Sequence, residues 1–184
     1  MPIEVRCALR DGECELEVLA RIGDRLREAP SPPNRRELVV FGHGGPEGVG
    51  DGASRPDCVL RASPPRTAEQ TPTGEVVLAV GCRTAPELLA AICPRDVPRA
   101  AGYAEELRIP RALEELDTDA LEALVLFLRA TLDGAATCPD TPTLRDTLYR
   151  PGAALRAAWS SRDSFFLDGF VEQLRDALML RVAP

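Results

Sequence analysis

The segment "ELVVFGHGGPEGVG" (Glu37–Gly50) contains four consecutive apolar residues, a glycine and then the only histidine of the chain, His43. A second apolar run, "EVVLAV" (Glu75–Val80), ends in a similar way, at a glycine followed by Cys82. Strands that are apolar at every position, rather than at alternate positions, are typical of a parallel sheet with helices on both faces. We therefore predict that both runs are central strands of such a sheet.

The rest of the sequence alternates between strand and helix patterns. Strands are predicted at Pro2–Leu9 and Arg99–Tyr103, and helices at Glu13–Glu28, Pro86–Ile92, Asp119–Leu132 (capped by Asp117 or Thr118), Leu144–Trp159 and Ser164–Arg181. Residues 44–74 are predicted to form a loop with a small hairpin, and residues 134–143 a loop. This alternation predicts one α/β domain over residues 1–184, a three-layer sandwich with a largely parallel central sheet.

Composition bears on the partners. The chain has 184 residues and a formal net charge of −7, with no basic cluster longer than Arg35-Arg36, so we expect neither nucleic acid nor an anionic membrane as a partner. The longest apolar run, Ala123–Leu128, is too short to span a bilayer, and the chain does not open with a basic segment followed by an apolar one. We expect a cytoplasmic protein.

The cysteines and glycines do not indicate a cofactor. The six cysteines contain no CxxC pair and there is one histidine, so neither a structural metal nor a disulfide framework is predicted. Gly42, Gly44 and Gly48 follow a strand in a nucleotide-like spacing, but Pro46 and the glycine-rich residues after it do not favour the helix start that a pyrophosphate requires. We predict no cofactor and no metal.

His43 and Cys82 each follow a predicted central strand. Catalytic and ligand-binding residues of parallel sheets lie beyond the carboxyl ends of the strands, so the two side chains are expected on one rim of the sheet. An imidazole can activate a thiol and protonate a leaving amine. Alternatively, His43 could be a hydrogen-bonded residue at a strand end and Cys82 an inert buried thiol. The backbone N–H groups of Gly44 and Cys82 are candidate donors to an oxyanion.

Three blocks of the chain resemble the caspase-like cysteine peptidases of the caspase–hemoglobinase fold, and most closely the bacterial CHAT peptidases. They are "VVFGHGG", "VLAVGCRTA" and "RAAGYAEEL" (Arg99–Leu107), in the order found in that family. The resemblance covers roughly residues 1–133, and residues 134–184 are expected to be a helical C-terminal part. It implies Cys82 as nucleophile, His43 as general acid and base, and Gly44 with Cys82 as oxyanion donors. Gly81 stands where the family commonly has alanine, and the family often closes with a strand bearing Trp and Phe.

The resemblance predicts a cysteine endopeptidase that cleaves a protein partner in a bacterial regulatory, immune or cell-death pathway, controlled by a separate regulatory or sensor protein. Glu105, Glu106 and Asp51 are candidates for binding a basic substrate side chain, and both glutamates could equally be solvated charges. Two other functions stay open. One is a catalytically inactive caspase-like fold that acts as a binding or scaffold module, and the other is an α/β hydrolase or transferase that uses the same pair on a small molecule.

Overall fold

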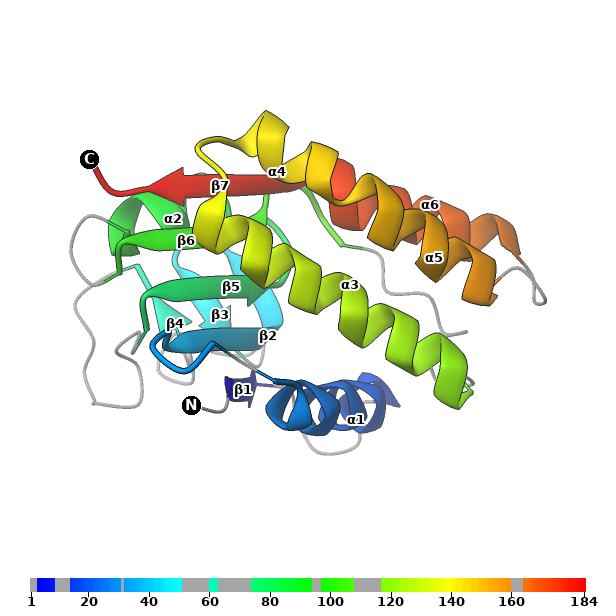
Figure 1. The fold of residues 1–184 in the computed structure, drawn as a ribbon. Coiled ribbons are helices and arrows are strands. Elements are labelled where there is room, and N and C mark those ends of the chain that lie inside the picture. The colour runs from blue at the N-terminus through cyan, green and yellow to red at the C-terminus, as the bar shows by residue number, and fades with distance from the viewer. Residues whose placement is uncertain are drawn as a thin grey trace.

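The computed structural model describes residues 3–8, 14–30, 32–50, 60–62, 74–93, 97–107, 117–159 and 164–184. Figure 1 shows its elements, which are, in chain order, β1 (Glu4–Ala8), α1 (Cys14–Glu28), β2 (Glu37–Gly45), β3 (Gly48–Gly50), β4 (Leu60–Arg61), β5 (Val76–Val80), α2 (Glu87–Ile92), β6 (Arg99–Tyr103), α3 (Thr118–Thr137), α4 (Thr141–Thr147), α5 (Tyr149–Trp159), α6 (Ser164–Asp176) and β7 (Leu178–Val182). Strands and helices alternate as the sequence predicts over the first two thirds of the chain.

The strands form one mixed sheet in the order β4-β3-β2-β5-β6-β7, with β1 also paired to β2. The pairs β1–β2, β2–β5 and β5–β6 are parallel, whereas β2–β3, β3–β4 and β6–β7 are antiparallel. β1 pairs with residues 38–42 of β2, and β3 pairs with the last three residues of the same strand. The antiparallel β3–β4 pair confirms the predicted small hairpin. The fold is an α/β sandwich, but its sheet is mixed, and the predicted parallel pairing holds only for β1, β2, β5 and β6.

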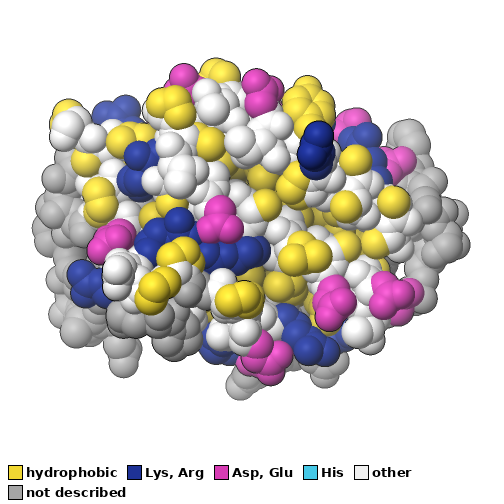
Figure 2. Space-filling model, in the orientation of Figure 1, with side chains coloured by type: hydrophobic (Ala, Val, Ile, Leu, Met, Phe, Trp, Pro, Cys, Tyr) yellow, Lys and Arg dark blue, Asp and Glu magenta, His cyan; other side chains and the backbone are white. Residues whose placement is uncertain are grey.

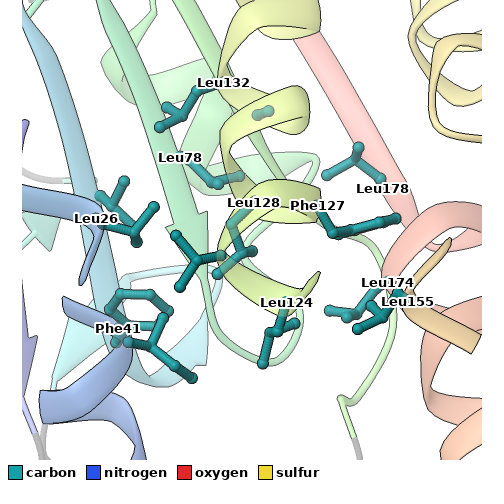
Figure 3. Packing of buried hydrophobic residues seen from close by; sticks show 14 of the residues in the cluster. Leu26, Phe41, Leu78, Leu124, Phe127, Leu128, Leu132, Leu155, Leu174 and Leu178 are labelled. Atoms are coloured by element: carbon teal, nitrogen blue, oxygen red, sulfur yellow. The ribbon is translucent and has the colours of Figure 1, made fainter. Parts of the chain in front are cut away.

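Both faces of the central strands are covered. Val39, Phe41 and Leu78 are at most 1% exposed and belong to the core formed with α1, α3, α5 and α6. Figure 3 shows Phe41, Leu78 and Leu128 gathered between the sheet and α3. Leu38 and Val77, on the opposite face, are fully buried in a smaller core with α2, and Figure 1 shows α2 behind the sheet, opposite α1 and α3. Burial on both faces explains why these strands are apolar at every position.

Asp117 is the predicted cap of α3, and its side chain accepts a hydrogen bond from the backbone N–H of Ala120. The helix itself runs to Thr137, past the predicted end at Leu132. Gly134 lies inside it because α4 packs there closely: a Cβ at this position would lie 2.4 Å from Leu144 Cδ1. The prediction that residues 134–143 form a loop was therefore wrong for most of that segment.

The predicted single helix Leu144–Trp159 is two helices, α4 and α5. Pro151 explains the interruption, because proline has no backbone N–H with which to continue the helical hydrogen bonds to the carbonyl four residues earlier. Asp140 caps α4, accepting a hydrogen bond from the N–H of Thr143. The break between α4 and α5 leaves α4 packed beside β7.

The predicted helix Ser164–Arg181 ends at Asp176, and Leu178–Val182 forms the strand β7 instead. Leucine and methionine are good helix formers, but here pairing with β6 satisfies the backbone and overrides that preference. The outer edge of β7 is covered from α4: the Thr141 hydroxyl accepts a hydrogen bond from Leu180 N–H, and Arg145 Nε donates to the Leu178 carbonyl. Side-chain bonds of this kind shield a strand edge from pairing with another chain.

The surface is mixed in character. On the face shown in Figure 2, acidic and basic side chains are interspersed with hydrophobic ones. Leu126 and Tyr149 are the large hydrophobic side chains most exposed within the described residues, at 67% and 58%. Of the helices in the part of the chain that the structure describes, none combines the length and the hydropathy needed to cross a membrane.

Candidate functional site

The register of two neighbouring strands brings His43 and Cys82 to the same level of the sheet. β2 and β5 are parallel and pair Phe41 with Val80, and His43 and Cys82 each lie two residues further along. His43 lies on β2 two residues after Phe41, and residues two apart on a strand project from the same face. Cys82 lies in the turn after β5 and packs against the same core as Phe41. The predicted placement of both residues at one rim of the sheet agrees with this topology.

A cavity of about 110 Å³ lies at this rim, and both His43 and Cys82 line it. Three helices supply much of the remaining wall: Leu19 and Ile22 from α1, Leu124 and Leu128 from α3, and Phe170 and Leu174 from α6. The imidazole is exposed, whereas Cys82 is half-buried and packs against the larger core. The two reactive groups thus share one hollow whose other side is apolar.

Two glycines allow the segments that carry these groups to touch. A Cβ at Gly44 would lie 2.3 Å from the carbonyl oxygen and 2.7 Å from the nitrogen of Cys82. A Cβ at Gly81 would lie 2.7 Å from the Gly42 oxygen. All three distances are shorter than van der Waals contact, so this backbone requires glycine at both positions. The alanine that is common at the second position in the resembled family does not fit here without a shift of β2.

The turn after β5 is fixed by a buried hydroxyl. Thr84 is fully buried, and its Oγ1 accepts a hydrogen bond from Tyr103 N–H at 2.9 Å and lies 3.2 Å from the Ala79 carbonyl oxygen. Arg83, next to Cys82, has φ of 49° and donates its N–H to the Glu105 carbonyl at 3.0 Å. Positive φ is uncommon for a residue other than glycine and occurs where the surroundings hold it in place. The turn that presents Cys82 is therefore held by the end of β6.

The Cys82 thiol donates a weak hydrogen bond to the Leu107 carbonyl oxygen, with a sulfur to oxygen distance of 3.6 Å. Leu107 also lines the cavity and is 7% exposed. In this arrangement the thiol hydrogen atom points to the segment after β6. Transfer of that hydrogen to the imidazole would require the Cys82 side chain to give up this contact.

The predicted oxyanion donors lie side by side, since the Gly44 α-carbon packs on the backbone of Cys82. That their N–H groups converge on one point stays a prediction. Glu105 and Glu106 have exposed side chains, and neither lines the cavity. Their backbone carbonyls accept hydrogen bonds, that of Glu106 from Gln173 Nε2 at 3.4 Å. Asp51 lies outside the described residues, so the substrate-binding role of these three acids stays a prediction.

Two further described cysteines have structural surroundings. Burial raises the pKa of the Cys93 thiol, which lies 3.4 Å from both the Pro98 and the Arg181 carbonyl oxygens. Burial likewise raises the pKa of Cys7, against a smaller opposing effect of Arg27. A raised pKa keeps a thiol protonated and unreactive at neutral pH. Among the described residues, no three histidine, cysteine or acidic side chains are clustered as a metal site would require.

The helical wall of the cavity was not anticipated from the sequence. Leu124 and Leu128 belong to an apolar helical stripe, and such a stripe reads as core whether or not a cavity lies against it. Leu107 has no sequence signal beyond its place after β6.

No protein-family model, no curated protein and no solved structure matches the chain. The chemistry of the His43 and Cys82 pair is therefore the basis on which a function can be assigned.

Proposed function

We propose that this chain is a cysteine peptidase in which Cys82 is the nucleophile and His43 the general acid and base. One observation carries the proposal: His43 near the end of β2 and Cys82 in the turn after the neighbouring parallel strand β5 line one cavity. A nucleophile and a base that meet at the carboxyl-end rim of a sheet form a common arrangement for acyl transfer.

The reaction follows from these two groups. His43 takes the thiol proton of Cys82, and the sulfur attacks the carbonyl carbon of a peptide bond. The tetrahedral intermediate collapses to a thioester as the C–N bond breaks, and the imidazolium gives its proton to the leaving amine. Water, deprotonated by His43, then attacks the thioester, releasing the carboxylic acid and returning the proton to the sulfur.

The more specific assignment, to the caspase-like fold and the CHAT peptidases, is part of the proposal. Support comes from the three sequence blocks, which fall on the adjacent strands β2, β5 and β6 in that order. The antiparallel β7 also supports it, since the family often closes with a further strand, although β7 contains neither Trp nor Phe. On this basis the substrate is a protein partner in a bacterial cytoplasmic pathway, and a separate protein delivers the signal.

An irreversible active-site probe tests the pair directly. A peptidyl acyloxymethyl ketone should add to Cys82 of the wild type, as located by mass spectrometry, and His43→Ala should slow labelling at neutral pH by at least a hundredfold. Cys93→Ala is the matched control and should label at the wild-type rate, because the Cys93 thiol is buried against the Pro98 and Arg181 carbonyl oxygens and does not line the cavity. Equal labelling rates for His43→Ala and the wild type would reject the pair. A folded wild type that does not react would favour the inactive binding module.

A further inference from the structure

We propose that the cavity beside His43 and Cys82 binds an apolar side chain, of the size of leucine or methionine, from the substrate residue on the acyl side of the cut. This inference rests on the proposed peptidase activity and names its specificity. It also replaces the basic side chain that the sequence suggested for this position.

The chemistry of the wall selects an apolar group. Among the residues that the structure describes, thirteen line the cavity; nine of them are aliphatic or aromatic, and none of the thirteen is an acid, a lysine or an arginine. A guanidinium or carboxylate placed there would lose its hydration without gaining a partner of opposite charge, at a cost of several kcal/mol. Glu105 and Glu106, the acids that the sequence suggested for substrate binding, have exposed side chains and do not line this cavity.

The size of the cavity limits the occupant. An apolar protein cavity of about 150 Å³ holds benzene, and this one measures about 110 Å³. A branched or flexible aliphatic side chain has fewer heavy atoms than benzene and suits a space of this size. Ala and Gly would leave much of the wall without contacts.

The position of the sulfur indicates which substrate residue enters. Cys82 is part of the cavity wall, and the acyl part of the substrate becomes covalently attached to its sulfur in the thioester. A side chain one bond from the reacting carbonyl therefore starts at the mouth of the cavity. The leaving amine departs before the thioester is hydrolysed, so its side chain has no such fixed place.

The first test is a scan of fluorogenic peptides that differ only in the residue before the cut, on the wild-type protein. We expect kcat/KM for Leu or Met to exceed that for Ala by about tenfold to several hundredfold, because each buried methylene contributes a factor of this kind. Arg and Asp should be cleaved more slowly than Ala. A higher kcat/KM for Arg than for Leu would overturn the inference and leave the peptidase proposal standing.

The second test fills the cavity. Leu124→Phe adds bulk at a wall residue that is 3% exposed, whereas Leu126→Phe makes the same change two residues along α3, where the side chain is 67% exposed. The first variant should shift the Leu to Ala preference toward Ala by at least tenfold, and the second should leave it unchanged. If the cavity-filled variant stays folded and keeps the wild-type preference, this cavity is not the specificity pocket.

A binding measurement separates the two proposals and needs no activity. Peptide acids that end in Leu or Arg are titrated calorimetrically into Cys82→Ala, which keeps the cavity but not the nucleophile. At least tenfold tighter binding of the Leu peptide supports the pocket, even if the wild type hydrolyses no peptide and the peptidase proposal fails. Equal affinity, or binding of neither peptide, overturns the pocket.

Discussion

Replacing Gly44 by alanine is predicted to damage both the stability and the activity of the protein, because this glycine lies directly against the backbone of Cys82. The new Cβ would start 2.3 Å from the Cys82 carbonyl oxygen, where real contacts are longer than 3.0 Å. Both neighbours are backbone atoms, so no side chain can rotate away to make room. The end of β2 must therefore move away from the turn after β5 by about an ångström.

Overpacking of this kind costs about 1–3 kcal/mol in the free energy of unfolding. For a domain of this size each kcal/mol corresponds to about 2–4 °C in Tm, so the melting temperature should fall by about 2–12 °C. The same shift separates His43 from Cys82, and a misplacement of about an ångström can lower a catalytic rate a hundredfold. Probe labelling of Cys82 should therefore slow by more than the stability loss explains.

The neighbouring glycine supplies a matched control. A Cβ at Gly45 would have no atom of the described residues within 4 Å, so Gly45→Ala should change the unfolding free energy by less than about 0.5 kcal/mol. Thermal melts and labelling rates of the two variants, measured side by side, decide the matter. If Gly44→Ala melts and labels like Gly45→Ala, the close approach of the two segments is not as described.

Two other changes test the packing of β6 on the turn after β5 and the ion pairs of α3. Gly102→Ala places a Cβ 2.6 Å from the Thr84 hydroxyl and should lower the unfolding free energy by about 1–3 kcal/mol in urea titrations; an unchanged midpoint would contradict the packing of β6 on the turn. Burial opposes ionisation of Asp133, but hydrogen bonds from Arg129 and Arg35 outweigh it and lower the pKa of the carboxyl below 3.8. A carboxyl whose pKa is lower in the folded state stabilises the fold at pH values above its unfolded-state pKa, and this stabilisation is lost as the pH falls through the folded-state pKa. Asp133→Asn should therefore lower the unfolding free energy by about 0.5–1 kcal/mol at pH 7, since the group is half-exposed, and by progressively less below pH 3.8. A constant difference in unfolding free energy across that pH range would refute the linkage.

The sequence was sufficient to place the pair but not the cavity. The uninterrupted apolar residues in β2 and β5 reflect burial on both faces of the sheet, which can be predicted from the sequence of each strand by itself. Once both segments are parallel neighbours, the residues that follow them must share a rim. The cavity depends on how far α1, α3 and α6 lie from that rim and from one another. Distances between helices cannot be predicted from local sequence patterns.

The errors toward the C-terminus have the same origin. "ALMLRV" suits a helix as well as a strand, and pairing with β6 decides between them. Gly134 reads as a helix end because glycine is a weak helix former, yet α3 continues through it to admit Leu144 from α4. In both segments a distant partner determines the local structure. Pro151 is different, since its effect on the helix is local.

The hydroxyl of Thr84 is the best place to separate the support of the nucleophile from general stability. Valine has the same shape, so Thr84→Val removes the hydroxyl without opening a cavity. It leaves the N–H of Tyr103 buried without the acceptor that now lies at 2.9 Å, and an unpaired buried donor costs about 1–3 kcal/mol. It also loosens the turn that presents Cys82, because the same oxygen lies 3.3 Å from the Gly81 carbonyl.

Thr131→Val is the matched control for Thr84→Val. Thr131 is also fully buried, but its hydroxyl donates to the Phe127 carbonyl four residues earlier in α3. Because that carbonyl also accepts a backbone bond within the helix, removing the hydroxyl leaves no polar group unpaired and should change stability by less than about 0.5 kcal/mol. Thr84→Val should be less stable by urea denaturation and, while still fully folded, should label at Cys82 at least tenfold more slowly, with Thr84→Ser restoring both. If both valine variants lose the same stability and keep wild-type labelling, the Thr84 hydroxyl fills space in the core and does not hold the nucleophile in place.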